Sequence, residues 1–174
     1  MDLALLALRV VIGLLFVGHG SQKLFGAFGG AGLNGTADLF DAIGLRPGQL
    51  HARAAGAAEV AGGALLALGL LTPVGAALVI AVMVAAIAAV HLPKGVWDSN
   101  GGYEYNLVMV AGAFALAGVG PGGWSLDNAL GIDWSSTGWA LGALGAGLLG
   151  GGATMIAGRL AADRDDRGPR PHPA

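Results

Sequence analysis

The chain has 174 residues, of which 55% are hydrophobic and only 11% are charged, and its mean hydropathy is +0.68. A soluble globular domain carries about 25% charged residues, so the composition argues against a soluble enzyme and against disorder over most of the chain. The chain contains no cysteine and has a net charge of −2, which excludes disulfides and thiolate metal ligands and predicts no nucleic-acid partner.

Long runs without Asp, Glu, Lys or Arg mark the membrane spans, and they cover residues 10–22, 60–93, 105–126 and 134–158. A transmembrane helix needs about 20 mainly apolar residues, so the run 60–93 is too long for one span. Thr72-Pro73 interrupts this run. Because proline is tolerated in the first turn of a helix but not in its interior, we predict a tight hairpin there. The predicted spans are residues 3–24, 53–71, 74–92, 104–119 and 138–158.

The predicted fold is an all-α membrane protein, with an antiparallel four-helix transmembrane bundle in residues 1–130 and a fifth transmembrane helix in residues 131–158. Glycine lowers the intrinsic helicity of the fifth segment, but a membrane tolerates glycine because the backbone there must satisfy its own hydrogen bonds. Between the first two spans, residues 36–45 fit a short interfacial helix or a re-entrant segment. Residues 159–174 alternate Arg, Asp and Pro, which predicts a disordered charged tail.

The basic residues are distributed unequally between the two membrane faces. With five spans, one face carries eight of the nine, namely Lys23, Arg46, Arg53, Lys94, Arg159, Arg164, Arg167 and Arg170. The ninth, Arg9, lies within the first span. Because basic residues favour the cytoplasmic side, we expect the N-terminus outside and the C-terminus in the cytoplasm.

Ionisable groups inside the spans converge at one membrane face. Each costs about 2.5–3.5 kcal/mol on insertion scales, so such groups indicate either a functional site or a buried pair. Because successive spans run antiparallel, the end of one span and the start of the next meet at the same face. The residues that we predict to line a ligand pocket there are His19, Lys23, Glu59, His91, Trp97, Glu104 and Asn106.

Glu59 is the deepest of these groups, about 9 Å inside the second span if that helix begins near Arg53. Gly56 and Gly62-Gly63 flank it, and small residues at such spacing let a neighbouring helix approach closely. Glu59 could instead form a structural ion pair, for which the candidate cations are Lys23, Arg9 and Arg53.

Simpler roles are open for the other candidates. Lys23, Arg53 and Lys94 can extend to the lipid headgroups, and Trp97 fits an interfacial aromatic belt together with both tyrosines. Glu104 suits the first turn of a helix, where its charge complements the helix dipole. The histidines and carboxylates show no recognisable metal-ligand spacing, so no metal site is predicted.

Several motifs together resemble the DoxX family of small bacterial membrane proteins. They are Arg9 with Gly13 and Phe16, residues 18–26 (GHGSQKLFG), Glu59 with Gly62-Gly63, Gly69 and Thr72-Pro73, His91, Trp97, residues 101–106 (GGYEYN), residues 120–122 (GPG) and residues 125–127 (SLD). The resemblance covers about residues 3–128 and implies a compact four-helix bundle in the bacterial inner membrane. The fifth segment and the charged tail depart from the family pattern.

The resemblance also implies a redox role, since some relatives are linked to quinone-coupled oxidoreductases and another belongs to an oxidative-stress complex. We therefore expect a membrane subunit of a redox-linked complex, without independent catalysis, that binds a small amphipathic ligand such as a quinone or anchors a soluble oxidoreductase. A small-solute or proton-conducting protein and a structural scaffold without ligand are the alternatives. Expected partners are lipid and either other proteins or further copies of the chain.

Overall fold

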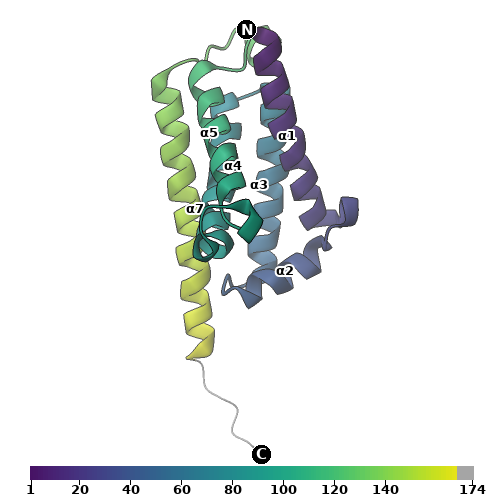
Figure 1. The fold of residues 1–174 in the computed structure, drawn as a ribbon, viewed down its shortest axis with the longest axis vertical. Helices are drawn as coiled ribbons and strands as arrows, with labels where there is room; N and C mark the ends of the chain where they lie inside the picture. The colour runs from purple at the N-terminus through teal and green to yellow at the C-terminus, as the bar shows by residue number, and fades with distance from the viewer. Residues whose placement is uncertain (168–174) are drawn as a thin grey trace, which may run out of the picture.

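The computed structural model describes residues 1–167, and within them it is all-α, with no strands. Five long helices run alternately down and up the molecule, from the N-terminus at the top of Figure 1 to the end of α7 at the bottom. They are α1 (Asp2–Phe25), α3 (Gly48–Leu68), α4 (Thr72–Ala86), α5 (Glu104–Val119) and α7 (Thr137–Asp166). The shorter elements are η1 (Ala27–Gly29), α2 (Gly32–Ala42), η2 (Ile87–His91), η3 (Leu92–Lys94), η4 (Asp98–Asn100) and α6 (Leu126–Ala129).

The helices form two closely packed pairs, α1 with α3 and α4 with α7, and α3 also packs against α4. Glycine sets the first contact: a Cβ placed on Gly13 would lie 2.4 Å from the Gly63 carbonyl oxygen, and one on Gly63 would lie 2.5 Å from the Gly13 carbonyl oxygen. The two backbones therefore touch, as small residues at a helix interface allow. Phe16 and Leu116 are among the fully buried side chains of the core.

The outer surface of the bundle is apolar, as lipid requires. Leu14, Leu107, Val108 and Leu149 are each at least half exposed. Three helical segments of the described chain are long and apolar enough to cross a membrane, namely Asp2–Phe25, Thr72–Lys94 and Thr137–Asp165, and α5 is a shorter apolar helix. The chain is therefore an all-α membrane protein.

The helix boundaries refine the predicted spans. The predicted range 104–119 is the range of α5, whereas α3 begins at Gly48, five residues before the prediction. The short helix α2 lies where an interfacial or re-entrant segment was expected. The third span does not stay α-helical, because η2 is a π-helical turn that widens the end of α4 before η3.

The prediction of a disordered tail is wrong for its first part, because α7 continues through Asp166. Extending a helix that already exists costs less than starting one, and Arg159, Leu160, Ala161 and Ala162 are all strong helix formers. The remainder of the predicted tail, residues 168–174, lies outside the described residues.

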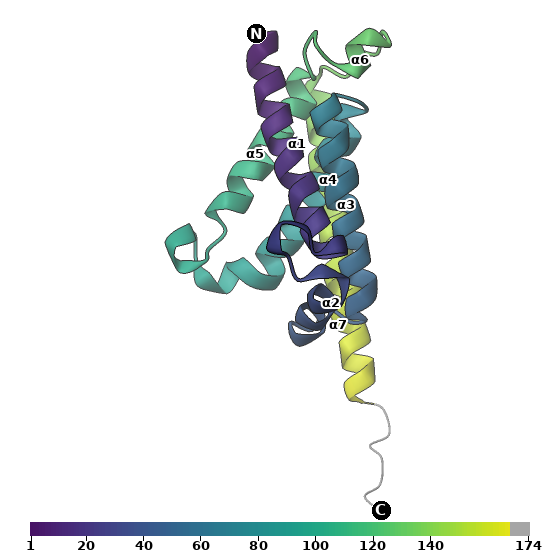
Figure 2. The same ribbon diagram turned by 90° about the vertical axis from the view of Figure 1, so that its right-hand side faces the viewer.

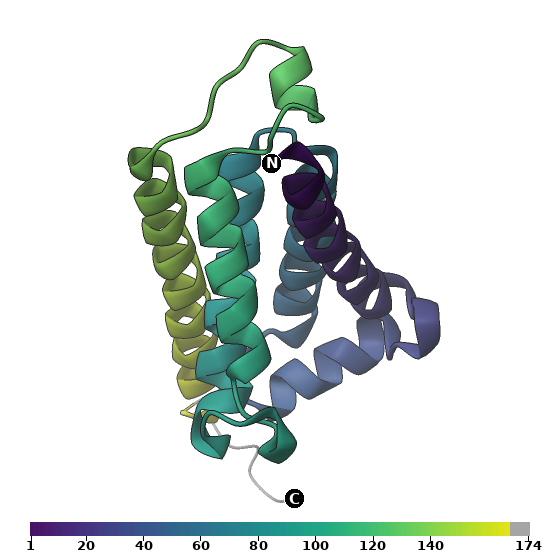
Figure 3. The ribbon, with the colours of Figure 1, turned by 45° about the horizontal axis from the view of Figure 1, so that its top comes forward.

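The two ends of the bundle differ in charge and shape. At one end lie the N-terminus and α6, whose connections arch over the helix ends (Figure 3). At the other end lie α2, the turn between α4 and α5, and the last turns of α7 (Figure 1). We call it the basic end because it carries Lys23 of α1, Arg53 of α3 and Arg164 of α7, although acidic residues such as Asp163 lie there too. In Figure 2, α5 diverges from α1 toward this basic end.

Candidate functional site

The candidate site lies where α1 packs against α3 near the basic end. A Cβ on Gly20 would lie 2.6 Å from the Gly56 carbonyl oxygen, so the two helices remain in backbone contact at this level. Lys23 is one turn further along α1 from Gly20, and Glu59 is one turn further along α3 from Gly56. Because α1 and α3 are antiparallel, Lys23 and Glu59 lie on opposite sides of this glycine contact, and the long lysine side chain spans it to reach the carboxylate.

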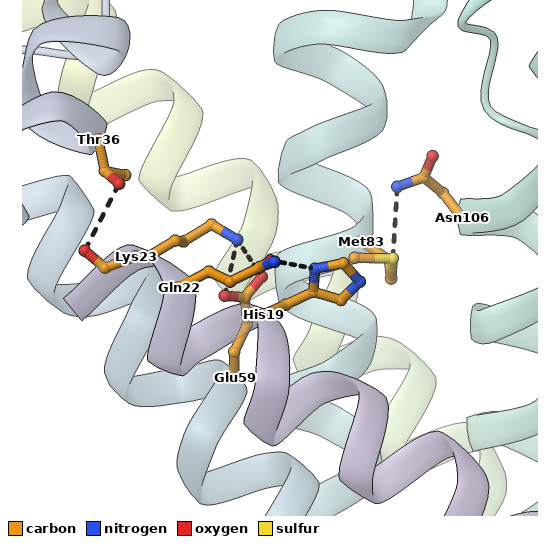
Figure 4. A network of polar contacts seen from close by, with 7 residues as sticks. All are labelled: His19, Gln22, Lys23, Thr36, Glu59, Met83 and Asn106. Carbon is orange, nitrogen blue, oxygen red and sulfur yellow. Dashed lines mark hydrogen bonds and ion pairs between the residues drawn. The ribbon is translucent and has the colours of Figure 1, made fainter. Parts of the chain in front are cut away.

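Lys23 and Glu59 form a direct ion pair (Figure 4). The Lys23 ammonium Nζ donates to Glu59 Oε1 at 2.8 Å and lies 2.8 Å from Oε2, which has no hydrogen-bond donor of its own. The side chain of Glu59 is 3% exposed and that of Lys23 is 26% exposed. The carboxylate is therefore enclosed by protein, whereas the cation can be reached from outside.

Two further polar side chains line the same region. His19 Nδ1 donates to Gln22 Oε1 at 3.2 Å, which leaves His19 Nε2 as the free ring nitrogen. Across from it, Asn106 of α5 is buried, and its amide Nδ2 donates to the thioether Sδ of Met83 at 3.3 Å (Figure 4). A thioether is a weak acceptor, so the Asn106 amide remains available to a stronger one.

Tyr105 completes this region from α5. Its ring stands edge-on to the His19 ring, with centroids 6.3 Å apart and an interplanar angle of 70°. Its hydroxyl is buried without a hydrogen-bond partner and lies within electrostatic reach of Glu59. Its sequence position predicts an interfacial residue, whereas the structure packs its ring against His19. The spacing from Gly112 indicates this position, because residues seven apart lie on one helix face and Gly112 faces α1.

Three of the predicted pocket residues, His91, Trp97 and Glu104, lie in or beside the connection between α4 and α5. His91 Nδ1 donates to the Gly101 carbonyl oxygen at 2.8 Å, and Glu104 Oε2 accepts from the Asp98 backbone N–H at 3.1 Å. Trp97 is 64% exposed. These contacts order the connection between α4 and α5, which leaves the bundle with α5 (Figure 2).

Neither of the other two candidate cations pairs with Glu59. Arg53 is exposed and donates to Gln49 Oε1 at 3.1 Å, one turn away on its own helix. Arg9 lies about four turns from Lys23 along α1, at the α6 end of the bundle. Lys23 forms the pair because the close α1–α3 contact leaves Glu59 within reach of its long side chain.

Arg9 instead joins three segments at the α6 end. It is 2% exposed, and its two terminal nitrogens donate to the carbonyl oxygens of Ala67, at the end of α3, and Trp124, in the connection to α6. Cations are favourable at helix C-termini because the last carbonyl groups there have no intrahelical partner. Arg9 therefore satisfies the end of α3 and fixes the loop beside it.

Asp127 stabilises the N-terminus of α4. Its carboxylate is fully buried and accepts from the Leu71 N–H at 2.8 Å, the Thr72 N–H at 3.1 Å and the Thr72 hydroxyl at 2.8 Å. The backbone N–H of Asp127 also donates to the Gly69 carbonyl oxygen at 2.8 Å. Asp127 thus caps a helix more than fifty residues away, for which no local sequence signal exists.

Two cavities of about 380 Å³ lie at the α6 end. One is lined by Leu6, Arg9 and Trp124 among others, and the other by Asp133, Trp134 and neighbouring loop residues. Neither is lined by Lys23 or Glu59.

Outside the spans, Asp133 forms a compact turn with Ser135. The Ser135 hydroxyl and backbone N–H both donate to Asp133 Oδ1, the latter at 2.8 Å. These hydrogen bonds, the hydroxyl first, hold the pKa of Asp133 below its ordinary value. Within residues 1–167, no group of three or more His, Asp or Glu side chains is placed to hold a metal ion.

Fold and site together define a multi-helix membrane protein with a buried ion pair near its basic end. The chain belongs to the DoxX family, whose model matches residues 4–92. It is 31% identical over 138 residues to the uncharacterised membrane protein Rv3486 of Mycobacterium tuberculosis, covering 73% of this chain and 81% of that protein. It is 32% identical over 117 residues to CatD of Bacillus subtilis, which is named as a proposed oxidoreductase, covering 67% of this chain and 81% of CatD. No solved structure matches the chain significantly.

Proposed function

We propose that the chain is the membrane subunit of a redox-linked complex and binds a quinone-type ligand beside the Lys23–Glu59 pair. The observation that carries the proposal is a buried carboxylate, Glu59, with one oxygen lacking a hydrogen-bond donor and a partly exposed cation, Lys23, as its partner. Ionisable groups at membrane depth are costly and mark functional sites. The name of CatD, which describes an oxidoreductase, supports a redox-linked role.

The residues present suit such a ligand. A quinone ring offers two acceptor oxygens and an apolar face, and it supplies two-electron, two-proton redox chemistry when bound. Lys23 Nζ and Asn106 Nδ2 are the donors for the ring oxygens, and Met83 provides an apolar neighbour. His19 Nε2 and the Glu59 carboxylate, which pairs with Lys23, would accept protons at the same place.

The electrons would come from a soluble oxidoreductase docked at the basic end. The DoxX resemblance implies such a partner, since one relative belongs to an oxidative-stress complex. The basic and acidic side chains at that end would pair with complementary charges on the partner. Extraction in mild detergent followed by mass spectrometry of the intact complex, lipids included, would identify both the partner and any bound quinone.

The basic end would face the cytoplasm of a bacterium, with the N-terminus outside the inner membrane, because Lys and Arg favour the cytoplasmic side. Single cysteines at Asp133 and Arg164 test this arrangement in a chain that has no other thiol. The two positions should react with an impermeant maleimide from opposite sides. Labelling of both from the same side would show that α7 does not cross the membrane.

The decisive binding test uses decyl-1,4-benzoquinone as the probe and the full chain in lipid nanodiscs. The proposal expects saturable binding that weakens in His19→Ala and Glu59→Gln, with Arg53→Gln as a control because Arg53 makes no contact with Glu59. Equal partitioning of the probe into protein-containing and empty nanodiscs would disprove it.

A structural role for the pair is the second candidate, because the intact ion pair joins α1 to α3. In that case the probe does not bind and the effects of substitution are confined to stability. Proton flux through liposomes carrying the chain, lost in Glu59→Gln, would instead favour a conducting protein.

A further inference from the structure

The hydroxyl of Tyr105 is a buried donor that the chain itself leaves unused. It is enclosed by protein, has no hydrogen-bond partner, and lies within electrostatic reach of Glu59. Buried polar groups in proteins are nearly always hydrogen-bonded, and an exception calls for an explanation such as a functional role or an ordered water molecule. The position of the residue on α5 indicates which explanation applies.

Tyr105 belongs to the seam between α1 and α5. At the middle of this seam, a Cβ on Gly112 would lie 2.8 Å from Ile12 Cδ1, so the helices are close there. Seven residues along each helix, His19 meets Tyr105 in the edge-on contact of 6.3 Å. This is the register of two antiparallel helices, and it places Tyr105 across the seam from the residues of α1 that hold Glu59.

The seam widens at the level of Tyr105. In Figure 2, α5 moves away from α1 toward the turn between α4 and α5. The His19–Tyr105 contact therefore joins the two helices where their backbones diverge. A flat molecule that separated these two rings would have Lys23, Glu59 and His19 on one side and Tyr105 on the other.

We infer that Tyr105 is a ligand-binding residue whose hydroxyl donates to an acceptor oxygen of a planar ring held between α1 and α5. The inference rests on the proposed function and narrows the ligand class. Donors on both helices select a ring with acceptor oxygens on opposite edges, as in a 1,4-dicarbonyl ring, over a ring with one polar edge.

The experiment compares Tyr105→Phe with Tyr103→Phe, which makes the same chemical change two residues away in the same chain. Phenylalanine keeps the ring that packs on His19 and removes only the hydroxyl. Two probes are titrated into the full chain in lipid nanodiscs: decyl-1,4-benzoquinone, and decylbenzene, which lacks the ring oxygens.

The expected result is a roughly five- to tenfold weaker affinity of Tyr105→Phe for decyl-1,4-benzoquinone, the effect of one lost hydrogen bond. Decylbenzene binding and the unfolding temperature should not change, because the hydroxyl has no partner in the chain. Tyr103→Phe should match the parent with both probes.

The outcomes separate the two levels of the proposal. If the parent does not bind the quinone more tightly than decylbenzene, the proposed function fails and the role of Tyr105 fails with it. If the parent shows this preference and Tyr105→Phe retains it in full, the inference about Tyr105 alone is overturned. A lower unfolding temperature in Tyr105→Phe would overturn it too, since the hydroxyl would then have a structural partner such as a bound water molecule.

Discussion

The two cations of α1 occupy opposite ends of the bundle and have different surroundings: Arg9 is buried, whereas Lys23 is partly exposed. Arg9 donates to the carbonyl oxygens of Ala67 and Trp124, and the nearby Asp127 carboxylate is fully occupied by the start of α4. Lys23 pairs with Glu59. The second oxygen of that carboxylate, Oε2, has no hydrogen-bond donor, and the nearby Tyr105 hydroxyl has no hydrogen-bond partner. Among the described residues at the α6 end, the unpartnered buried atoms, Arg9 Nε and Trp134 Nε1, are both donors. The basic end instead has an unpartnered acceptor, Glu59 Oε2, and an unpartnered donor, the Tyr105 hydroxyl, near one ion pair. That difference separates a structural cluster from a candidate site.

The largest expected effect comes from Gly63→Leu, which lies between the two clusters and would disrupt both. Its Cβ alone would approach the Gly13 carbonyl oxygen to 2.5 Å, so α1 must move away from α3. We expect the free energy of unfolding to fall by about 3 kcal/mol or more. In detergent this loss would appear as a smaller fraction of monodisperse protein. Gly142→Leu is the control, because its Cβ would meet open space. Equal stability of the two variants would contradict the close α1–α3 contact.

Lys23→Met tests the basic end by removing the cation and leaving a buried carboxylate. Breaking a buried pair from one side costs about 3–5 kcal/mol, and Glu59 is nearly inaccessible to solvent. We expect a loss of stability of that order in chemical unfolding, restored in the double variant Lys23→Met with Glu59→Gln. A double variant no more stable than the single one would show that the ion pair is not the cause.

Asp127→Ala tests the α6 end by exposing the start of α4. The Leu71 and Thr72 N–H groups would lose their charged acceptor, and hydrogen bonds to charged groups contribute about 1.5–3 kcal/mol each. We expect about 3 kcal/mol lower stability with ligand affinity unchanged, since the site is at the other end. Asp133→Ala, an exposed change in the same region, serves as the control and should leave stability close to that of the parent.

Glu59→Gln sharpens the comparison, because at the basic end we expect binding to change more than stability. Lys23 is 26% exposed, so its ammonium can reach the headgroups when its partner loses charge. Stability should fall by less than about 1 kcal/mol, within the range of an ordinary substitution, while decyl-1,4-benzoquinone binding is lost. A loss of stability as large as that in Lys23→Met would favour the structural reading of the pair.

The smallest effect is expected from Ser135→Ala, which changes a single exposed carboxylate at the α6 end. The Ser135 hydroxyl is the main cause of the lowered pKa of Asp133. A lowered folded-state pKa adds stability above the ordinary carboxyl pKa, and this stability is lost as pH falls through the lowered value. Ser135→Ala should therefore raise the pKa of Asp133 toward its ordinary value in a carboxyl NMR titration. Ser136→Ala, which removes the cap of α7 instead, should leave the titration unchanged.

Much of the fold could be predicted because helices that cross a membrane need long runs of apolar, uncharged residues. Charge-free runs and Thr72-Pro73 located the long helices, and the DoxX resemblance is confirmed by the match over residues 4–92. The gathering of Lys23 and Glu59 also followed from antiparallel geometry alone. The composition of residues 159–166 alone favours disorder, but α7, which precedes them, continues through Asp166.

The details of the two clusters could not be predicted, because they depend on loops. The partners of Arg9 and Asp127 come from segments more than fifty residues away. His91 and Glu104 lie at the expected membrane face, but the turn between α4 and α5 uses them for its own hydrogen bonds. Spacing along a helix indicates the level of a side chain and not which neighbour it meets.

The unequal lengths of α5 and α7 have a consequence for the surrounding bilayer. The 16 residues of α5 extend about 24 Å, less than the roughly 30 Å hydrocarbon core, whereas the charge-free part of α7, residues 137–158, extends about 33 Å. The protein therefore fits a thinner bilayer on its α5 flank than on its α7 flank. Because the energy of hydrophobic mismatch rises with each ångström, lipid chain length would act first on the turn between α4 and α5, where α5 diverges from α1 (Figure 2).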